Sequence, residues 1–128
     1  MQGLEAQRDP LTEAVIGAAI EVHKALGPGL LESAYVLCLC HELTQRGLSV
    51  TREVPIPISY KGVGLDAGYR IDVLVNDELV VEVKAVLEHH PLFQAQLLTY
   101  LRLSGKRKGL LINFNVPVVK DGIRRFVL

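Results

Sequence analysis

The sequence has little tryptophan, cysteine or net charge: its 128 residues include no tryptophan and two cysteines, and the formal net charge is zero. A protein that coats nucleic acid through bulk electrostatics is disfavoured, because such domains are usually strongly basic. No apolar run approaches the roughly 20 residues of a membrane-spanning helix, and the start of the chain lacks the basic-then-apolar order of a signal peptide. A cytoplasmic protein is therefore expected.

The two cysteines, Cys38 and Cys40, lie two positions apart in a predicted helix, where side chains do not face each other. Neither a disulfide nor a shared metal site is expected, and both are predicted to be buried thiols. With no tryptophan and only three phenylalanines, the chain also has little from which to build a surface for stacking nucleobases. Single-strand binding through stacking is thus disfavoured by composition.

Apolar residues make up 49% of the chain, which is ample for one packed core. A single domain spanning residues 1–128 is expected. Three helices follow from apolar residues at three- and four-residue steps. The first begins at Asp9-Pro10 and stops at Gly27, the second ends near Gly47, and the third runs from Pro91 to Gly105. The apolar stripe of the second helix consists of Leu31, Tyr35, Leu39 and Leu43.

Between and after these helices the apolar pattern indicates strands. Residues 50–59 alternate as one half-buried strand, and Pro55 and Pro57 place it at a sheet border because both lack a donor on the same edge. Residues 61–68 are expected to form a hairpin connection. Further strands are predicted over 69–75, 79–86, 109–114 and 124–128. The chain therefore reads as a three-layer α/β domain with a mixed central sheet flanked by helices.

The helix that starts at Pro91 separates strand 79–86 from the nearly all-apolar strand 109–114. Strands covered on both faces are typical of parallel sheets. The helix is therefore predicted to be a crossover connection between two parallel neighbours.

Three charged residues stand out within the predicted strands. Glu82 and Lys84 point to one face of theirs, and Asp72 is a lone acid in the strand before it. With a three-residue loop, Asn76-Asp77-Glu78, Val75 pairs with Leu79, which places Asp72 opposite Glu82 on the same face. A two-residue loop would put the two acids on opposite faces.

Two facing carboxylates about 5 Å apart repel each other unless one is protonated or a cation lies between them. Oxygen ligands at this spacing suit Mg²⁺ or Mn²⁺, which bind through a few carboxylates together with substrate phosphate. Lys84 beside them can stabilise the charge that develops on a phosphate in the transition state. Asp72 and Glu82 are thus candidate metal ligands, and Lys84 is a candidate catalytic cation.

The order of Asp72, Glu82 and Lys84 resembles the D-(x)n-ExK signature of the PD-(D/E)XK nuclease superfamily. Gln96 and Tyr100 match the QxxxY motif of its RecB-like and lambda-exonuclease-like branch. The resemblance implies a PD-(D/E)XK-type core, Mg²⁺ or Mn²⁺ as cofactor and hydrolysis of nucleic-acid phosphodiesters, with DNA favoured over RNA. It also implies Glu32, on a helix before the sheet, as a third metal ligand, and Gln96 as a member of the catalytic site.

A narrower resemblance covers nearly the whole chain. Gly29, Glu32 and Tyr35 are similar to the namesake motif of the GxxExxY protein family, and residues 22–29 and 109–115 are similar to its flanking motifs. The chain departs from that family at Phe93, where a histidine commonly precedes the QxxxY glutamine by three positions. The resemblance therefore implies no ligand at this position.

The remaining candidates are weaker. Lys106, Arg107 and Lys108 read as a solvated surface or as contacts to a phosphate backbone, and Tyr100 is a further candidate contact to nucleic acid. His23 is expected to be structural, and the adjacent histidines 89 and 90 are expected to be solvent-exposed. Two rivals to a nuclease stay open: a non-catalytic nucleic-acid-binding or protein-interaction module on the same fold, and a subunit of a structural homo-oligomer.

Overall fold

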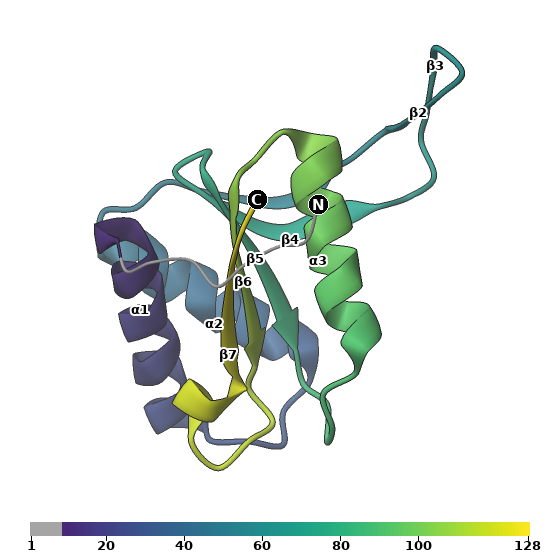
Figure 1. Cartoon of the computed structure of the whole chain (residues 1–128). Coiled ribbons are helices and arrows are strands. Elements are labelled where there is room, and N and C mark those ends of the chain that lie inside the picture. Colours follow the sequence, from purple (N-terminus) through teal and green to yellow (C-terminus); the bar gives the residue numbers. More distant parts are fainter. Residues whose placement is uncertain (1–8) are drawn as a thin grey trace.

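The computed structural model describes residues 9–128 as three layers, with a five-stranded sheet between helices (Figure 1). The helices are α1 (Pro10–Leu26), α2 (Glu32–Gln45) and α3 (Pro91–Ser104), with a short 3-10 helix η1 (Val119–Gly122). The strands of the main sheet are β1 (Val50–Pro55), β4 (Arg70–Val75), β5 (Leu79–Lys84), β6 (Lys108–Asn113) and β7 (Ile123–Val127). This confirms the predicted α/β class with a mixed sheet.

The sheet has the order β1-β4-β5-β6-β7, and only β5 and β6 run parallel. Helix α3 is the crossover between these two strands, as its position in the sequence predicted. β1 lies at the border, in agreement with the prolines at its end. Within residues 9–128, no helix has the length and apolar character needed to cross a membrane.

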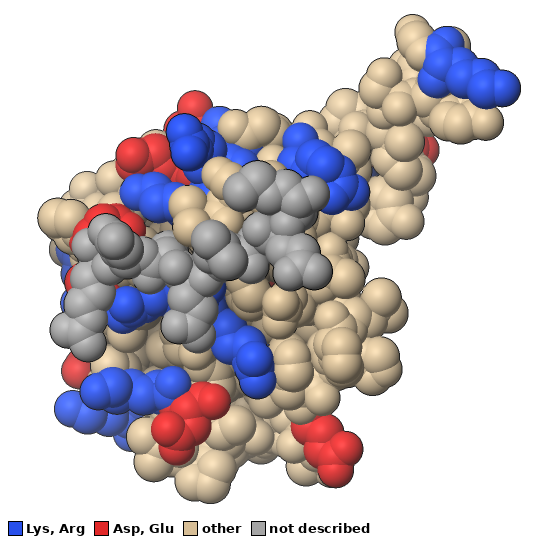
Figure 2. Space-filling model, viewed as in Figure 1, with Lys and Arg blue, Asp and Glu red and all other residues tan. Residues whose placement is uncertain are grey.

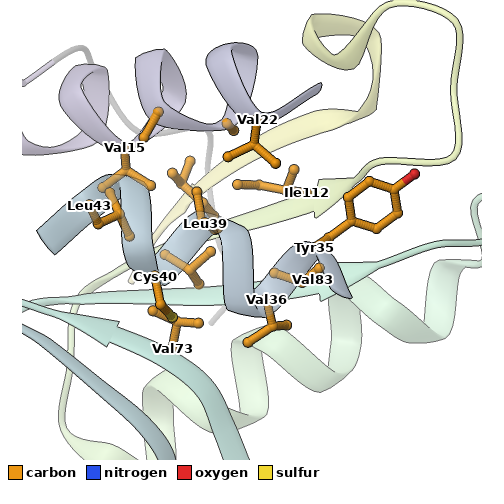
Figure 3. Packing of buried hydrophobic residues seen from close by; sticks show 14 of the residues in the cluster. Val15, Val22, Tyr35, Val36, Leu39, Cys40, Leu43, Val73, Val83 and Ile112 are labelled. Carbon is orange, nitrogen blue, oxygen red and sulfur yellow. The ribbon is translucent and has the colours of Figure 1, made fainter. Parts of the chain in front are cut away.

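Two apolar layers hold the helices to the sheet. On one face, α1 and α2 pack over the sheet, and Figure 3 shows Val22 and Leu39 in one cluster with Val83 and Ile112. On the other face, Leu97 and Leu101 of α3 pack against the sheet. Each large aliphatic side chain that is buried fully in this way stabilises the fold by about 1.5–3 kcal/mol. The side of the sheet that carries α3 also carries the polar residues described below.

Two predicted details of the second helix and its cysteines are wrong. α2 begins at Glu32, and Leu31 is its N-cap residue with 78% of its surface exposed, so Leu31 does not belong to the apolar stripe. Cys38 is exposed and only Cys40 is buried, because residues two apart on a helix face different directions. Both thiols are free, as expected.

Residues 50–68 differ most from the sequence prediction. The single strand predicted over 50–59 ends at Pro55, Ile56 is buried under α3, and the chain continues into a separate hairpin of β2 (Ile58–Tyr60) and β3 (Val63–Leu65). The donor-free prolines on both sides of Ile56 explain why ladder pairing stops there. This hairpin projects from the body of the domain (Figure 1), so the connection predicted over 61–68 is an arm of its own.

One glycine is required for close packing beside β6. A Cβ atom added to Gly122 would collide with the main-chain oxygen of Asn113. We expect Gly122→Ala to destabilise the fold by about 1–3 kcal/mol, because backbone must shift to make room. The matched control is Gly64→Ala, whose Cβ would enter open space at an ordinary φ. Urea unfolding of both variants tests this, and equal midpoints would contradict it.

Candidate active site

The site lies where the regular pairing between β4 and β5 ends, beyond Val73 and Val81. Val75 pairs with Leu79 and Val73 with Val81, which confirms the three-residue loop. The next pair in this register is Asp72 and Glu82. There, the Asp72 N–H donates to Glu82 Oε2 at 2.9 Å, and the Val83 N–H donates to Asp72 Oδ2 at 2.9 Å. These reciprocal bonds fix both carboxylates in the space between the strands.

The pair is electrostatically unfavourable on its own. Glu82 is only 4% exposed. Burial, and then the charge of Asp72, raise the pKa of Glu82 to about 8 despite the hydrogen bond from Asp72 and the nearby charge of Lys84. Burial also raises the pKa of Asp72, against the lowering effects of the Val83 N–H and Lys84. Two acids in this state favour the binding of a further positive charge.

Lys84, at the end of β5, is held by α3. Its Nζ atom lies 3.5 Å from Gln96 Oε1 and 4.7 Å from the centroid of the Phe93 ring. Gln96 Nε2 in turn donates to Tyr100 Oη at 3.0 Å, and Tyr100 is largely buried. The structure therefore brings Gln96 and Tyr100 together with Lys84, through one continuous chain of contacts.

Phe93, on α3, lies against Lys84. Its ring face provides a cation–π contact for the Lys84 ammonium. The neighbouring histidines are exposed, as expected. His90 caps α3 by accepting the Leu92 N–H at 3.0 Å, and His89 packs edge-on against Phe93.

Glu32 opens α2 and lies at the margin of the site. It is exposed as a residue, yet burial of its carboxyl raises its pKa, Lys84 lowers it and Asp72 raises it. The charges of the site thus act on Glu32. Nevertheless, no group of three or more His, Cys, Asp or Glu side chains within the described chain is gathered closely enough to hold a metal ion. Glu32 is near the pair but not assembled with it.

The loop before Glu32 is fixed by Tyr35, which is fully buried and stacks on Phe114 with centroids 4.6 Å apart. Tyr35 Oη donates to the Gly27 carbonyl at 2.6 Å and accepts the Leu30 N–H at 3.2 Å. The two partners lie on either side of the positive φ at Gly29. Tyr35 therefore sets the path by which the chain enters the helix of Glu32. His23 is structural too, since its Nε2 contacts the Val116 carbonyl at 2.8 Å.

Sequence reasoning missed the role of two asparagines, Asn113 as the last residue of β6 and Asn115 two positions later. Asn113 accepts the Val86 N–H and donates to the Val86 carbonyl, both at 3.0 Å, and so holds the chain that leaves β5. Asn115 Oδ1 accepts the Gly29 N–H at 3.1 Å. The sequence feature that could have identified Asn113 is an amide side chain at the end of an otherwise apolar strand. The two asparagines tie the loops on both sides of the site to the end of β6.

A third residue, Glu53, was missed on the border strand β1. Glu53 has a φ of 53°, in the left-handed region that few non-glycine residues adopt, and its charge contributes to raising the pKa of Asp72. It lies between Arg52 and Val54, which pair with Val73 and Ile71 on either side of Asp72. A positive φ at a single non-glycine residue leaves no periodic pattern in the sequence from which it could be predicted.

The donor set suits a divalent cation of the Mg²⁺ type. Asp72 and Glu82 each use one carboxylate oxygen for a backbone N–H, and the described chain provides no hydrogen bond to the other. Mg²⁺ is commonly held by one or two carboxylates plus substrate phosphate rather than by a full protein cage. The pair therefore fits such an ion without a third preassembled ligand.

The basic run after α3 lies apart from this site. Lys108 pairs with Leu79 at one end of β5, and Asn113 pairs with Lys84 at the other. The run and Lys84 are thus separated by about 16 Å of strand, at ~3.3 Å per residue. Lys106 forms an ion pair with Asp77 at 3.1 Å, and Lys108 forms one with Asp9 at 3.5 Å. On the face in Figure 2, basic side chains are separated by uncharged and acidic ones instead of forming one patch.

Comparison with known proteins agrees with this geometry. The family model described as the PD-(D/E)XK nuclease superfamily matches residues 9–126. No curated protein and no solved structure gives a significant match. The matched segment includes every helix and nearly all of the sheet, with the acidic pair and Lys84 at its centre. The chain therefore belongs to the PD-(D/E)XK nuclease superfamily.

Proposed function

We propose that this protein is a metal-dependent nuclease that hydrolyses phosphodiester bonds of nucleic acid, with DNA as the favoured substrate. The observation that carries the proposal is the reciprocal pair of Asp72 and Glu82 with Lys84 on the same strand as Glu82. Membership of the superfamily supports it. A bound Mg²⁺ or Mn²⁺ supplies Lewis-acid polarisation of the phosphate and neutralisation of its charge.

The acidic pair has the role of holding that ion. Each carboxylate keeps its orientation through a backbone N–H of the other strand, so the free oxygens are preorganised. Glu32 is proposed as a further residue that would hold the ion, because it lies close enough for the charges of Lys84 and Asp72 to act on it.

Lys84 has the role of stabilising the phosphate oxygens as negative charge builds on them. An ammonium held beside an acidic pair costs little reorganisation when the charge develops. Gln96 is a positioning residue, since it orients Lys84 and is itself oriented by Tyr100. Phe93 excludes water from one side of the ammonium.

Lys106, Arg107 and Lys108 are proposed to contact the phosphate backbone away from the cleaved bond. We expect the triple alanine variant to weaken binding similarly for all sequences, since phosphates carry no sequence information. The slope of the logarithm of the binding constant against the logarithm of salt concentration is expected to change by a value nearer one than three. Lys106 and Lys108 are already paired with acids, so fewer than three free charges are removed. Binding titrations at several salt concentrations measure it. A changed sequence preference with an unchanged slope would contradict the role.

The direct test is cleavage of end-labelled single- and double-stranded DNA and RNA with Mg²⁺, Mn²⁺ or EDTA. The expected result is cleavage with at least one of the two ions and none in EDTA. Binding without cleavage of any substrate would favour the alternative of a non-catalytic nucleic-acid-binding module. A cytoplasmic location stays a prediction of the sequence, and a homo-oligomer stays an open alternative.

A further inference from the structure

A cleft of about 550 Å³ opens beside Lys84 on the α3 side of the sheet. One wall is α3, and the other is formed by Tyr69 and by Ile58 at the base of the projecting hairpin. Lys84 and Gln96 belong to the lining, so the cleft is continuous with the active site. Its volume falls within the range of about 300–1,000 Å³ that is common for pockets that bind small molecules.

The lining of the cleft concentrates aromatic side chains of a chain that has few. Of four tyrosines and three phenylalanines, Tyr69, Phe93 and Tyr100 face it. Tyr69 is 41% exposed and packs edge-on against Tyr100 at a centroid distance of 6.0 Å. Low aromatic content argues against stacking only when the aromatic residues are dispersed, and here they are gathered.

The distribution of charge in the lining favours a nucleobase over a phosphate as the group bound in the cleft. Lys84 is the one charged residue among those that line the cleft, and it lies at the active-site end. The rest of the lining is apolar and aromatic, with Gln96 and Thr99 as polar groups. Phosphates would be poorly solvated beyond Lys84, whereas a nucleobase has apolar faces that stack on aromatic rings and polar edges that accept hydrogen bonds.

We propose that this cleft binds an unpaired nucleobase next to the phosphate at Lys84, so that the substrate is single-stranded or locally unpaired nucleic acid. The inference rests on the proposed nuclease function and adds the substrate class. Tyr69 supplies the stacking face. A base in a duplex must be unstacked and unpaired before it can enter such a cleft, so single strands bind at lower cost.

The test measures binding in EDTA, where cleavage does not interfere. Fluorescence anisotropy compares a short labelled oligothymidine, an abasic oligomer of the same length, an oligouridine and a blunt duplex. We expect the base-bearing single strands to bind more tightly than the abasic strand and the duplex. Tyr69→Leu should weaken oligothymidine binding roughly 5- to 150-fold, the effect of one stacked base, and Tyr69→Phe should retain it.

Two controls make the result specific to the cleft. Tyr60→Leu removes a tyrosine that is 60% exposed but does not line the cleft, and it should leave affinity unchanged. The abasic strand should bind Tyr69→Leu as well as it binds the unmutated protein. Equal affinity for abasic and base-bearing strands, or no effect of Tyr69→Leu, would overturn the inference even if the protein cleaves duplexes. Conversely, absence of cleavage with base-dependent binding would overturn the nuclease function alone.

Discussion

Lys84→Ala is expected to lower the turnover of nucleic-acid cleavage by roughly 10²- to 10³-fold, or about 3 to 4 kcal/mol, if the ammonium contributes like one oxyanion donor. An ammonium cannot ligate a cation and repels it. The affinity for Mg²⁺ or Mn²⁺ should therefore stay equal or rise slightly. Cleavage rates and metal titrations on the same folded preparation measure the two effects separately.

Two comparisons define the role of Lys84. Asp72→Ala should lose metal binding and turnover together, because it removes a ligand. Lys24→Ala, which removes an exposed lysine of α1 outside the proposed site, should leave turnover unchanged. Thermal melts exclude unfolding as the cause in each case. Full activity of Lys84→Ala would contradict the catalytic role of Lys84.

Glu82→Gln is expected to abolish cleavage and at the same time to stabilise the metal-free protein at pH 8. The pKa of Glu82 is raised to about 8 from its ordinary 4.5, so the folded state keeps a proton that the unfolded state releases between these values. The stability of the unmutated protein in EDTA should therefore fall as the pH rises through this window. Glutamine has no proton to release, and the expected gain is about 2–4 kcal/mol.

The measurement is urea unfolding in EDTA from pH 5 to pH 8.5. The curve of Glu82→Gln should be flatter than that of the unmutated protein, and the two should differ most at the highest pH. Adding Mg²⁺ should raise the stability of the unmutated protein at high pH, since an ion that binds only the folded state stabilises it by mass action. Parallel pH profiles for the two proteins would show that Glu82 ionises without cost.

The position of the acidic pair explains why Glu82→Gln is expected both to abolish cleavage and to stabilise the metal-free protein. Adjacent carboxylates, of which that of Glu82 is almost fully buried, weaken the metal-free fold, and the same arrangement favours a bound cation. The Asp72–Glu82 pair is held by backbone donors rather than by side chains of the core. Neutral substitutions can therefore relieve the repulsion and still keep the strands in register.

The sequence by itself determined the three helices, the order along the chain of the strands of the main sheet, and the register of the hairpin that carries the site. Period-two and helical spacing indicated these elements, and the odd loop Asn76–Glu78 placed Asp72 opposite Glu82 because strand side chains alternate. The all-apolar strand after α3 correctly indicated the parallel neighbour of β5. These features depend on local periodicity, which a single sequence records directly.

Only the tertiary structure decided how far each side chain reaches from its element. It showed Phe93 beneath Lys84, Asn113 and Asn115 as ties between loops, and the basic run at the opposite end of the strands from Lys84. It also turned residues 58–65 into a projecting hairpin and gathered Tyr69 and Tyr100 around one cleft. Such contacts join segments distant in the chain, and their geometry depends on packing and backbone direction rather than on spacing.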